Sequence, residues 1–333
     1  MPTPHSNIIK GYLLGAIAAI TYGMNPLFTL PLYSDGMDAC SVLFFRYLFG
    51  AITIGIMLLI RQPQETNADG HLSVRQPLTH PFAIFKIESR YLLPLFGLGI
   101  SMGVSSLTLF VSYNYMDAGI ASTLLFVYPI MVAVAMTLLF HERMTLRTVF
   151  CILTTTAGIF LLYKQNDGAT LSLIGTVIVL VSALTYAIYL IGINRHGLNH
   201  IPTLKITFYI LLFALLVYIA GIAYNGYLTI PSAEKWYLWL NLIALGLLPT
   251  VVSFTCSTIA IQHIGSTPVA ILGALEPVTA VLIGITLFSE RLTLREVSGI
   301  MLIITAVGLI VAGGSISNPL TRFRKLFPKS RRK

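Results

Sequence analysis

The chain has 333 residues, of which 56% are hydrophobic and only 10% are charged, with a formal net charge of +9 and a mean hydropathy of +0.83. A soluble globular chain carries about 25% charged residues, so this composition excludes an ordinary soluble domain. Cys40, Cys151 and Cys256 lie in or beside apolar runs without metal-ligand spacing, so we expect no metal site, no disulfide and no cofactor.

Apolar segments of membrane-spanning length recur along the whole chain. About 20 apolar residues are enough to cross the hydrocarbon core of a bilayer as a helix. The expected spans are residues 10–33, 40–61, 91–113, 118–140, 147–163, 171–193, 204–224, 236–261, 266–288 and 296–314. We therefore predict an all-α integral membrane protein with ten transmembrane helices.

Two polar or basic segments interrupt this pattern. The insert of residues 62–90, between the second and third spans, is mostly polar and shows no catalytic motif. The tail of residues 316–333 is strongly basic, and we expect it to contact anionic membrane lipid. The positive net charge therefore needs no nucleic-acid partner.

One stretch of the chain occurs twice. Residues 128–149 and 276–297 align at an offset of 148, with 9 of 22 positions identical, including a shared Glu-Arg-x-Thr-Leu-Arg run. A second match, of Gly11 and Thr21-Tyr22 with Gly175 and Thr185-Tyr186, has an offset of 164. The excess of 16 residues in the first half falls within the polar insert. These matches indicate an internal repeat.

The repeat divides the spans into two groups of five. An odd number of spans per half forces the second half to insert upside down relative to the first, as in many secondary transporters. We predict a first five-helix repeat at residues 1–165, with its cytoplasmic insert, a second at 166–315, and the tail at 316–333.

The Lys and Arg residues predict the orientation. With the N-terminus in the cytoplasm, 16 of them fall on the inner side and 4 on the outer side, and Arg46 lies inside a span. Because cytoplasmic loops are enriched in these residues, both termini are predicted to be cytoplasmic, in the cell membrane.

Ionisable groups within spans are costly and mark candidate functional sites. Glu276 lies about ten residues into the ninth span, roughly 15 Å deep, where its repeat partner is Tyr128. Arg46 lies about six residues into the second span, roughly 9 Å deep, where its repeat partner is Ile210. We expect both side chains to share one central polar region that binds substrate or couples protons, although Arg46 extending to the lipid headgroups is the alternative.

Further polar groups and helix breaks could build a pocket around Glu276. Prolines remove helical hydrogen bonds and free carbonyls, which is tolerated at depth where the backbone lines a cavity. The candidate helix breaks are Pro26, Pro129 and Pro277, and the candidate hydroxyl and amide groups are Tyr22, Asn25, Tyr113, Asn114, Tyr128 and Tyr186. A packed or interfacial aromatic is the alternative for each tyrosine.

The run Leu275-Glu276-Pro277-Val278, followed by Ser289-Glu290-Arg291-Leu292-Thr293, resembles the second domain of EamA-type transporters of the drug/metabolite transporter superfamily. The first half is similar through Tyr128-Pro129, His141-Glu142-Arg143-Met144-Thr145 and Arg46. The resemblance implies two inverted five-helix repeats, a central cavity, alternating access, and export or exchange of small metabolites, often amino acids.

The sequence therefore predicts a secondary transporter of a small metabolite, most simply an amino-acid exporter, and not an enzyme. The alternatives are a polytopic membrane enzyme and a non-transporting membrane receptor or scaffold. The chain has no Walker motif for ATP hydrolysis. Its short surface loops offer little acid–base chemistry beyond His141-Glu142 and Arg195-His196. Substrate identity, the coupling ion and the oligomeric state are not predicted.

Overall fold

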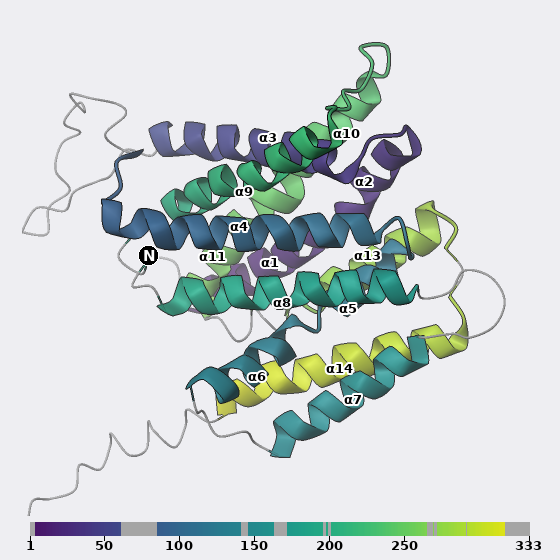
Figure 1. Cartoon of the computed structure of the whole chain (residues 1–333). Helices are drawn as coiled ribbons and strands as arrows, with labels where there is room; N and C mark the ends of the chain where they lie inside the picture. Colours follow the sequence, from purple (N-terminus) through teal and green to yellow (C-terminus); the bar gives the residue numbers. More distant parts are fainter. Residues whose placement is uncertain are drawn as a thin grey trace, which may run out of the picture. The chain divides into compact units, whose positions relative to one another are not determined.

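The computed structural model describes residues 4–60, 85–140, 146–162, 172–195, 201–264, 272–290 and 292–316, together with Leu198 and Val269. These residues form helices and connections, with no strand among them (Figure 1). The helices are α1 Pro4–Gly23, α2 Asn25–Ser34, α3 Ala39–Ile60, α4 Ser89–Ser112, α5 Ala118–Leu125, α6 Tyr128–Phe140, α7 Leu146–Leu162, α8 Leu173–Arg195, α9 Thr203–Asn225, α10 Trp236–Gly246, η3 Leu247–Val252, α11 Ser253–Ile264, α13 Leu275–Leu287 and α14 Leu294–Ile316.

Length and hydropathy make this an integral, multi-pass membrane protein. Within the described residues six helical segments are long and apolar enough to cross a membrane: Ile8–Ser34, Ala39–Ile60, Ser89–Ser112, Leu173–Ile193, Thr203–Asn225 and Trp236–Ala260. Three shorter apolar helices cover Ala118–Val132, Val149–Leu161 and Leu275–Leu287. The all-helical membrane class is thus confirmed, whereas the count of ten spans and their inverted arrangement stay predictions.

The chain forms two compact units, and each draws on both halves of the sequence. Unit 1 consists of residues 1–27, 108–187 and 252–333, and unit 2 of residues 28–107 and 188–251. The repeat boundaries expected near residue 165 therefore do not coincide with the boundaries of the compact units. Most of the polar insert and nearly all of the basic tail lie outside the described residues.

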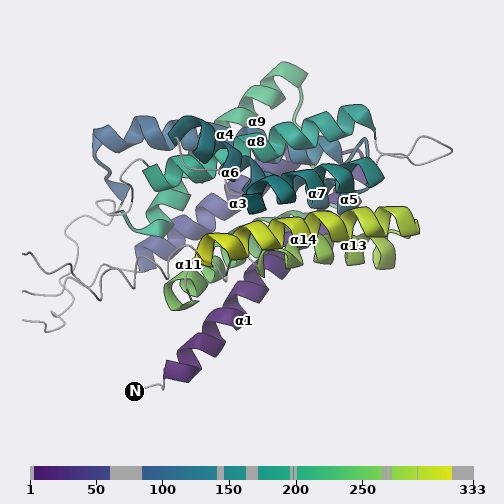
Figure 2. The ribbon, with the colours of Figure 1, turned by 90° about the horizontal axis from the view of Figure 1, so that it is seen from below.

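In unit 1, α7 packs along α14, α1 packs on α11 and α13, and α13 packs on α5. Figure 2 shows α7 and α14 running side by side. Glycine permits this approach, because a Cβ built at Gly158 on α7 would lie 2.8 Å from Ile303 Cγ1 and 2.9 Å from the Gly299 oxygen of α14. Such close backbone contacts are typical of helices that associate in lipid.

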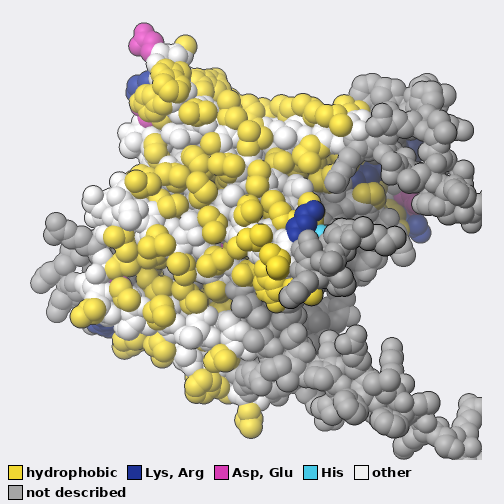
Figure 3. Space-filling view, turned by 180° about the vertical axis from the view of Figure 1, so that it is seen from behind, with side chains coloured by type: hydrophobic (Ala, Val, Ile, Leu, Met, Phe, Trp, Pro, Cys, Tyr) yellow, Lys and Arg dark blue, Asp and Glu magenta, His cyan; other side chains and the backbone are white. Residues whose placement is uncertain are grey.

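In unit 2, α3 packs on α9 and α10. A Cβ built at Gly99 would lie 2.5 Å from Phe213 Cβ, and one built at Gly103 would lie 3.2 Å from Ala214 Cα, so α4 meets α9 along a small-residue face. Large apolar side chains remain exposed on the outside of many helices, and hydrophobic atoms cover much of the described surface in Figure 3. This is the surface expected of a protein solvated by lipid.

The candidate helix-break prolines all stand at the start of a helix. Pro26 is the second residue of α2, Pro129 the second of α6 and Pro277 the third of α13. The first turn tolerates proline because its N–H groups have no partner within the helix. As a result, α1 ends at Gly23 just before α2, and α5 ends at Leu125 just before α6.

A capping box opens α14, as the Thr293-Glu296 spacing predicts. The Glu296 carboxylate accepts hydrogen bonds from the Thr293 N–H at 2.6 Å and from its hydroxyl at 2.8 Å, and the Glu296 N–H donates to Thr293 Oγ1 at 3.3 Å. Glu296 is 6% exposed. The box fixes the connection between α13 and α14, which carries Glu290.

Candidate functional site

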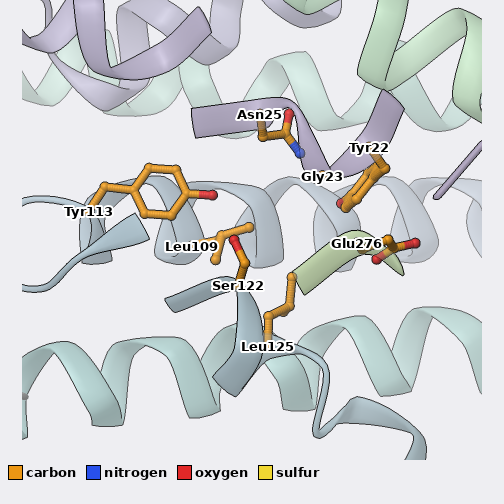
Figure 4. Close-up of a pocket in the computed structure, with 8 residues that line it drawn as sticks. All are labelled: Tyr22, Gly23, Asn25, Leu109, Tyr113, Ser122, Leu125 and Glu276. Atoms are coloured by element: carbon orange, nitrogen blue, oxygen red, sulfur yellow. The ribbon is translucent and has the colours of Figure 1, made fainter. Parts of the chain in front are cut away.

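A small pocket in unit 1 brings together the ends of five helices. It is formed where α1 ends, α2 begins, α4 ends and α13 begins, with α5 closing one side. The space between its walls, part of it open to solvent, is about 250 Å³. The lining residues are Tyr22, Gly23, Asn25, Leu109, Tyr113, Ser122, Leu125 and Glu276 (Figure 4).

The carboxyl group of the pocket comes from Glu276, in the first turn of α13. Negative charge is favoured there because the N–H groups at a helix N-terminus carry a positive partial charge. Figure 4 shows Tyr22 beside Glu276 at one end of the pocket, Tyr113 at the other, and Asn25 and Ser122 between them. The arrangement places a single acid and several hydrogen-bonding groups around one pocket.

The close contact between α1 and α13 forms part of the pocket wall. A Cβ built at Gly23 would lie 2.5 Å from the Glu276 carbonyl oxygen and 2.8 Å from Thr279 Cβ. Only glycine allows the end of α1 to approach the first turn of α13 this closely. Gly23 therefore places Tyr22 next to Glu276.

Asn25 carries an unused hydrogen-bonding group. Its side chain is 3% exposed, and Oδ1 is buried with no hydrogen-bond partner among the described residues. Leaving a buried polar atom unpaired costs roughly 1–3 kcal/mol. Such an atom in the wall of a pocket is satisfied when a polar ligand or water enters.

An aromatic pair lies at the start of α6. The rings of Tyr128 and Tyr186 meet edge to face, with centroids 4.7 Å apart and planes at 88°. Both belong to unit 1, and Tyr128 lies within electrostatic range of Glu276 and Tyr22. They are not among the residues that line the pocket.

Arg46 lies in unit 2 and is not among the residues that line the pocket. It is 2% exposed, and its Nε donates a 3.0 Å hydrogen bond to Thr250 Oγ1. Thr250 belongs to the π-helical segment η3 and itself donates to the Leu245 carbonyl at 3.3 Å. Arg46 is therefore buried within its unit, and a shared polar region with Glu276 stays a prediction.

Four of the candidates predicted from the sequence line one pocket in the structure: Tyr22, Asn25, Tyr113 and Glu276. Asn114 is exposed and lies outside it. Ser122, Leu109 and Leu125 were missed, because nothing in an apolar run marks which serine or leucine faces inward. Gly23 is recognisable only from its contact with α13.

The structure thus combines membrane-length apolar helices with a pocket that holds one acid and several hydrogen-bonding groups. The EamA-like transporter family model matches residues 9–164 and 173–312, which together make up most of the chain. The chain belongs to this family, as the resemblance of its Glu-Pro and Glu-Arg motifs indicates.

Curated relatives carry transporter names. The threonine/homoserine exporter RhtA of Escherichia coli strain K12 is 27% identical over 233 residues, covering 69% of this chain and 72% of RhtA. An uncharacterized transporter of Archaeoglobus fulgidus is 27% identical over 216 residues, covering 64% of this chain and 74% of that protein. One crystal structure has a TM-score of 0.60 at 16% identity, covering 92% of this chain and 98% of the other, a likeness of fold alone.

Proposed function

We propose that this chain is a secondary transporter that exports a small amino acid or related metabolite from the cell. It works by alternating access through a central cavity, with both termini in the cytoplasm and ten spans in two inverted repeats. The observation that carries the proposal is the pocket in unit 1, which one carboxyl group lines together with hydroxyl and amide groups.

The chemistry of the pocket supports an amino-containing solute. The Glu276 carboxylate would bind an ammonium group, while Asn25, Ser122 and Tyr113 would hydrogen-bond the polar groups of the rest of the molecule. The name of the RhtA relative describes an exporter of threonine and homoserine, both small hydroxyl-bearing amino acids. That name supports the direction and the substrate class proposed here.

Glu276 is proposed as the group whose charge changes during the cycle. A carboxyl group near the bilayer midplane can exchange a proton for an amino group, because desolvation favours the neutral acid and a bound cation favours the carboxylate. The site would then use one acid for both proton and substrate. Arg46 is proposed to contribute to the same cavity in another conformation of the cycle.

The test is flux into proteoliposomes with a panel of amino acids, nucleobases and sugar phosphates, for wild type and Glu276→Gln at several pH values. We expect an amino acid to be transported. We expect Glu276→Gln to lower the transport rate more than about tenfold, because the substitution removes a charge-assisted hydrogen bond. Glu88→Gln, which alters an exposed carboxyl paired with Arg90, serves as the control and should transport normally.

Two results would contradict the proposal. If no member of the panel moved down its gradient or against a pH gradient, the transport function would fail. If Glu276→Gln kept both the wild-type rate and the wild-type pH profile, Glu276 would have only a structural role.

A further inference from the structure

A second carboxyl site lies at the opposite end of the α5–α13 pair from the pocket. Past the C-terminus of α13, Ser289 adopts a left-handed φ of 56°, and the Glu290 N–H donates a 3.0 Å hydrogen bond to the Gly284 carbonyl. The bond closes seven residues, from Gly284 to Glu290, around a left-handed residue that follows the helix C-terminus. It turns the chain back over α13 and directs Glu290 toward the helix.

The Glu290 carboxyl group fills a site that only glycine leaves open. A Cβ built at Gly284 would lie 2.0 Å from Glu290 Oε2 and 2.5 Å from its Cδ. A Cβ built at Gly119 on α5 would lie 3.4 Å from the same oxygen. The carboxyl group is therefore held between the backbones of α13 and α5.

Glu290 supplies the acceptor that the first turn of α5 requires. Its carboxyl group accepts hydrogen bonds from the backbone N–H groups of Ala118 and Gly119. The N-cap residue of α5 is Asp117, whose side chain makes no capping hydrogen bond. Glu290, from the α13–α14 connection, therefore caps α5. Asp117 has a residue type that is favoured at N-caps but does not fill this role here.

Among the described residues, acidic side chains lie nearest to this site. Asp117 from α5 and Glu296 from α14 face the site, while Arg295 of α14 donates to the Phe160 carbonyl at 3.4 Å. Arg291 and Lys164 lie outside the described residues. Burial, followed by the charge of Asp117, raises the pKa of Glu290 to about 7 against the lowering effect of the two backbone hydrogen bonds. Burial, followed by the charge of Glu296, also raises the pKa of Asp117.

We propose that Glu290, with the charge of Asp117 nearby, forms a latch, which holds α5 against the α13–α14 connection when Glu290 is protonated and releases it when Glu290 ionises. The closed latch binds a proton more tightly than the open one, in which Glu290 is hydrated. Acid therefore stabilises closure, and this stabilisation is lost as the pH rises toward about 7.

The latch acts on the helices that build the pocket. Ser122 and Leu125 lie three and six residues beyond Gly119 on the eight-residue α5, and Glu276 lies on α13. By the Lys and Arg distribution, Asp117 and Glu290 face the outside. The latch would gate access to the pocket from that face according to external pH, a role that rests on the proposed transport function.

The other half of the sequence does not repeat this pair of acids. Glu142 matches Glu290 at the offset of 148, but Asp117 matches Gly265. Only one copy of the repeat therefore combines the two acids. Residues 141–145 and 265–268, where the other copy would lie, are outside the described part of the chain.

Hydrogen exchange of the backbone amides of α5, in purified protein and without a transported solute, tests the latch. After correction for intrinsic exchange, the opening constant should rise roughly twentyfold between about pH 5.5 and pH 7.5, given a carboxyl pKa of 4.5 when open and about 7 when closed. Glu290→Gln should reduce this change to less than about twofold, because the amide still accepts a hydrogen bond but cannot ionise.

Two further variants complete the design. Asp117→Asn should shrink the pH effect severalfold, because the neighbouring charge that raises the pKa of Glu290 is gone. Glu234→Gln, an exposed carboxyl in unit 2, should behave as wild type. Unchanged pH dependence in Glu290→Gln would overturn the protonation of Glu290 as the trigger, and unchanged pH dependence in Asp117→Asn would overturn the contribution of the Asp117 charge. Loss of protection at both pH values in Glu290→Gln would overturn the latch too, since it would show a structural cap instead. Neither result would bear on whether the chain transports a solute.

Discussion

At the scale of single residues, the pocket combines groups whose positions along the chain differ by more than 250 residues. Tyr22 and Glu276 meet because Gly23 has no side chain, and Tyr113 and Asn25 complete the row of polar groups. The neighbour of Tyr113, Asn114, is exposed. One step along the chain at the end of α4 thus separates a pocket residue from a surface residue.

Asn25→Ala should raise the KM for the transported amino acid roughly tenfold, since a hydrogen bond that satisfies a buried acceptor contributes about 1–3 kcal/mol. The melting temperature should change little, because Oδ1 makes no hydrogen bond within the described structure. The measurement is concentration-dependent flux in proteoliposomes. Thr29→Val is the matched control: it removes another buried, unpartnered oxygen from α2 that does not line the pocket. An equal rise in KM in both variants would argue against a direct role for Asn25.

At the scale of helices, the site depends on where helices stop. α1 and α2, and likewise α5 and α6, are separated by one or two residues, so that helix ends rather than helix sides line the pocket. Helix ends expose backbone N–H and C=O groups that the helix itself does not use. Within a membrane, such ends are stable only where protein or a polar cavity satisfies them.

Gly23→Ala should separate the end of α1 from α13, because its Cβ would meet the backbone oxygen of Glu276 rather than a flexible side chain. Overpacking of this kind costs about 1–3 kcal/mol. We expect a lower melting temperature in detergent together with reduced flux. Gly308→Ala on α14 is the control, since nothing lies within 4 Å of the added methyl group. Wild-type stability and flux in Gly23→Ala would show that the contact can relax without loss.

At the scale of the whole molecule, the chain is an integral membrane protein of the EamA-like transporter family. Each compact unit takes segments from both sequence halves. Exposed apolar side chains on most helices match a lipid environment. The distribution of Lys and Arg predicts how the chain is oriented in that environment.

Reporter fusions active only in the cytoplasm would test the topology. We expect activity for insertions near Asp69 and at the C-terminus, and none near Asp35 or Asn225, because Lys and Arg concentrate on the side that is predicted to face the cytoplasm. A parallel set of fusions without the basic residues of the tail measures how much of this bias the tail provides. Termini on opposite faces would eliminate the arrangement of ten spans in two inverted repeats.

The sequence by itself determined the membrane class, the family resemblance and the approximate bounds of the helices. Expected spans at 40–61, 91–113 and 204–224 correspond to α3, α4 and α9 within two residues at each end. The reason is local: a helix in lipid satisfies its own backbone hydrogen bonds, so a sufficient run of apolar residues is enough to define it. The sequence also marks Glu276 and Asn25 as candidate site residues, because burying a polar side chain within an apolar run costs free energy.

Only the tertiary structure decided which groups meet. Ser122 lies in the pocket and Asn114 does not, although the sequence favours Asn114. In the sequence, Glu290 belongs to the repeated Glu-Arg-x-Thr-Leu-Arg motif. In the structure it caps α5 near Asp117, which lies 173 positions earlier in the chain. These contacts depend on how each helix is rotated and where it ends against its neighbours. Such features arise from packing between distant segments and leave no local signal in composition or spacing.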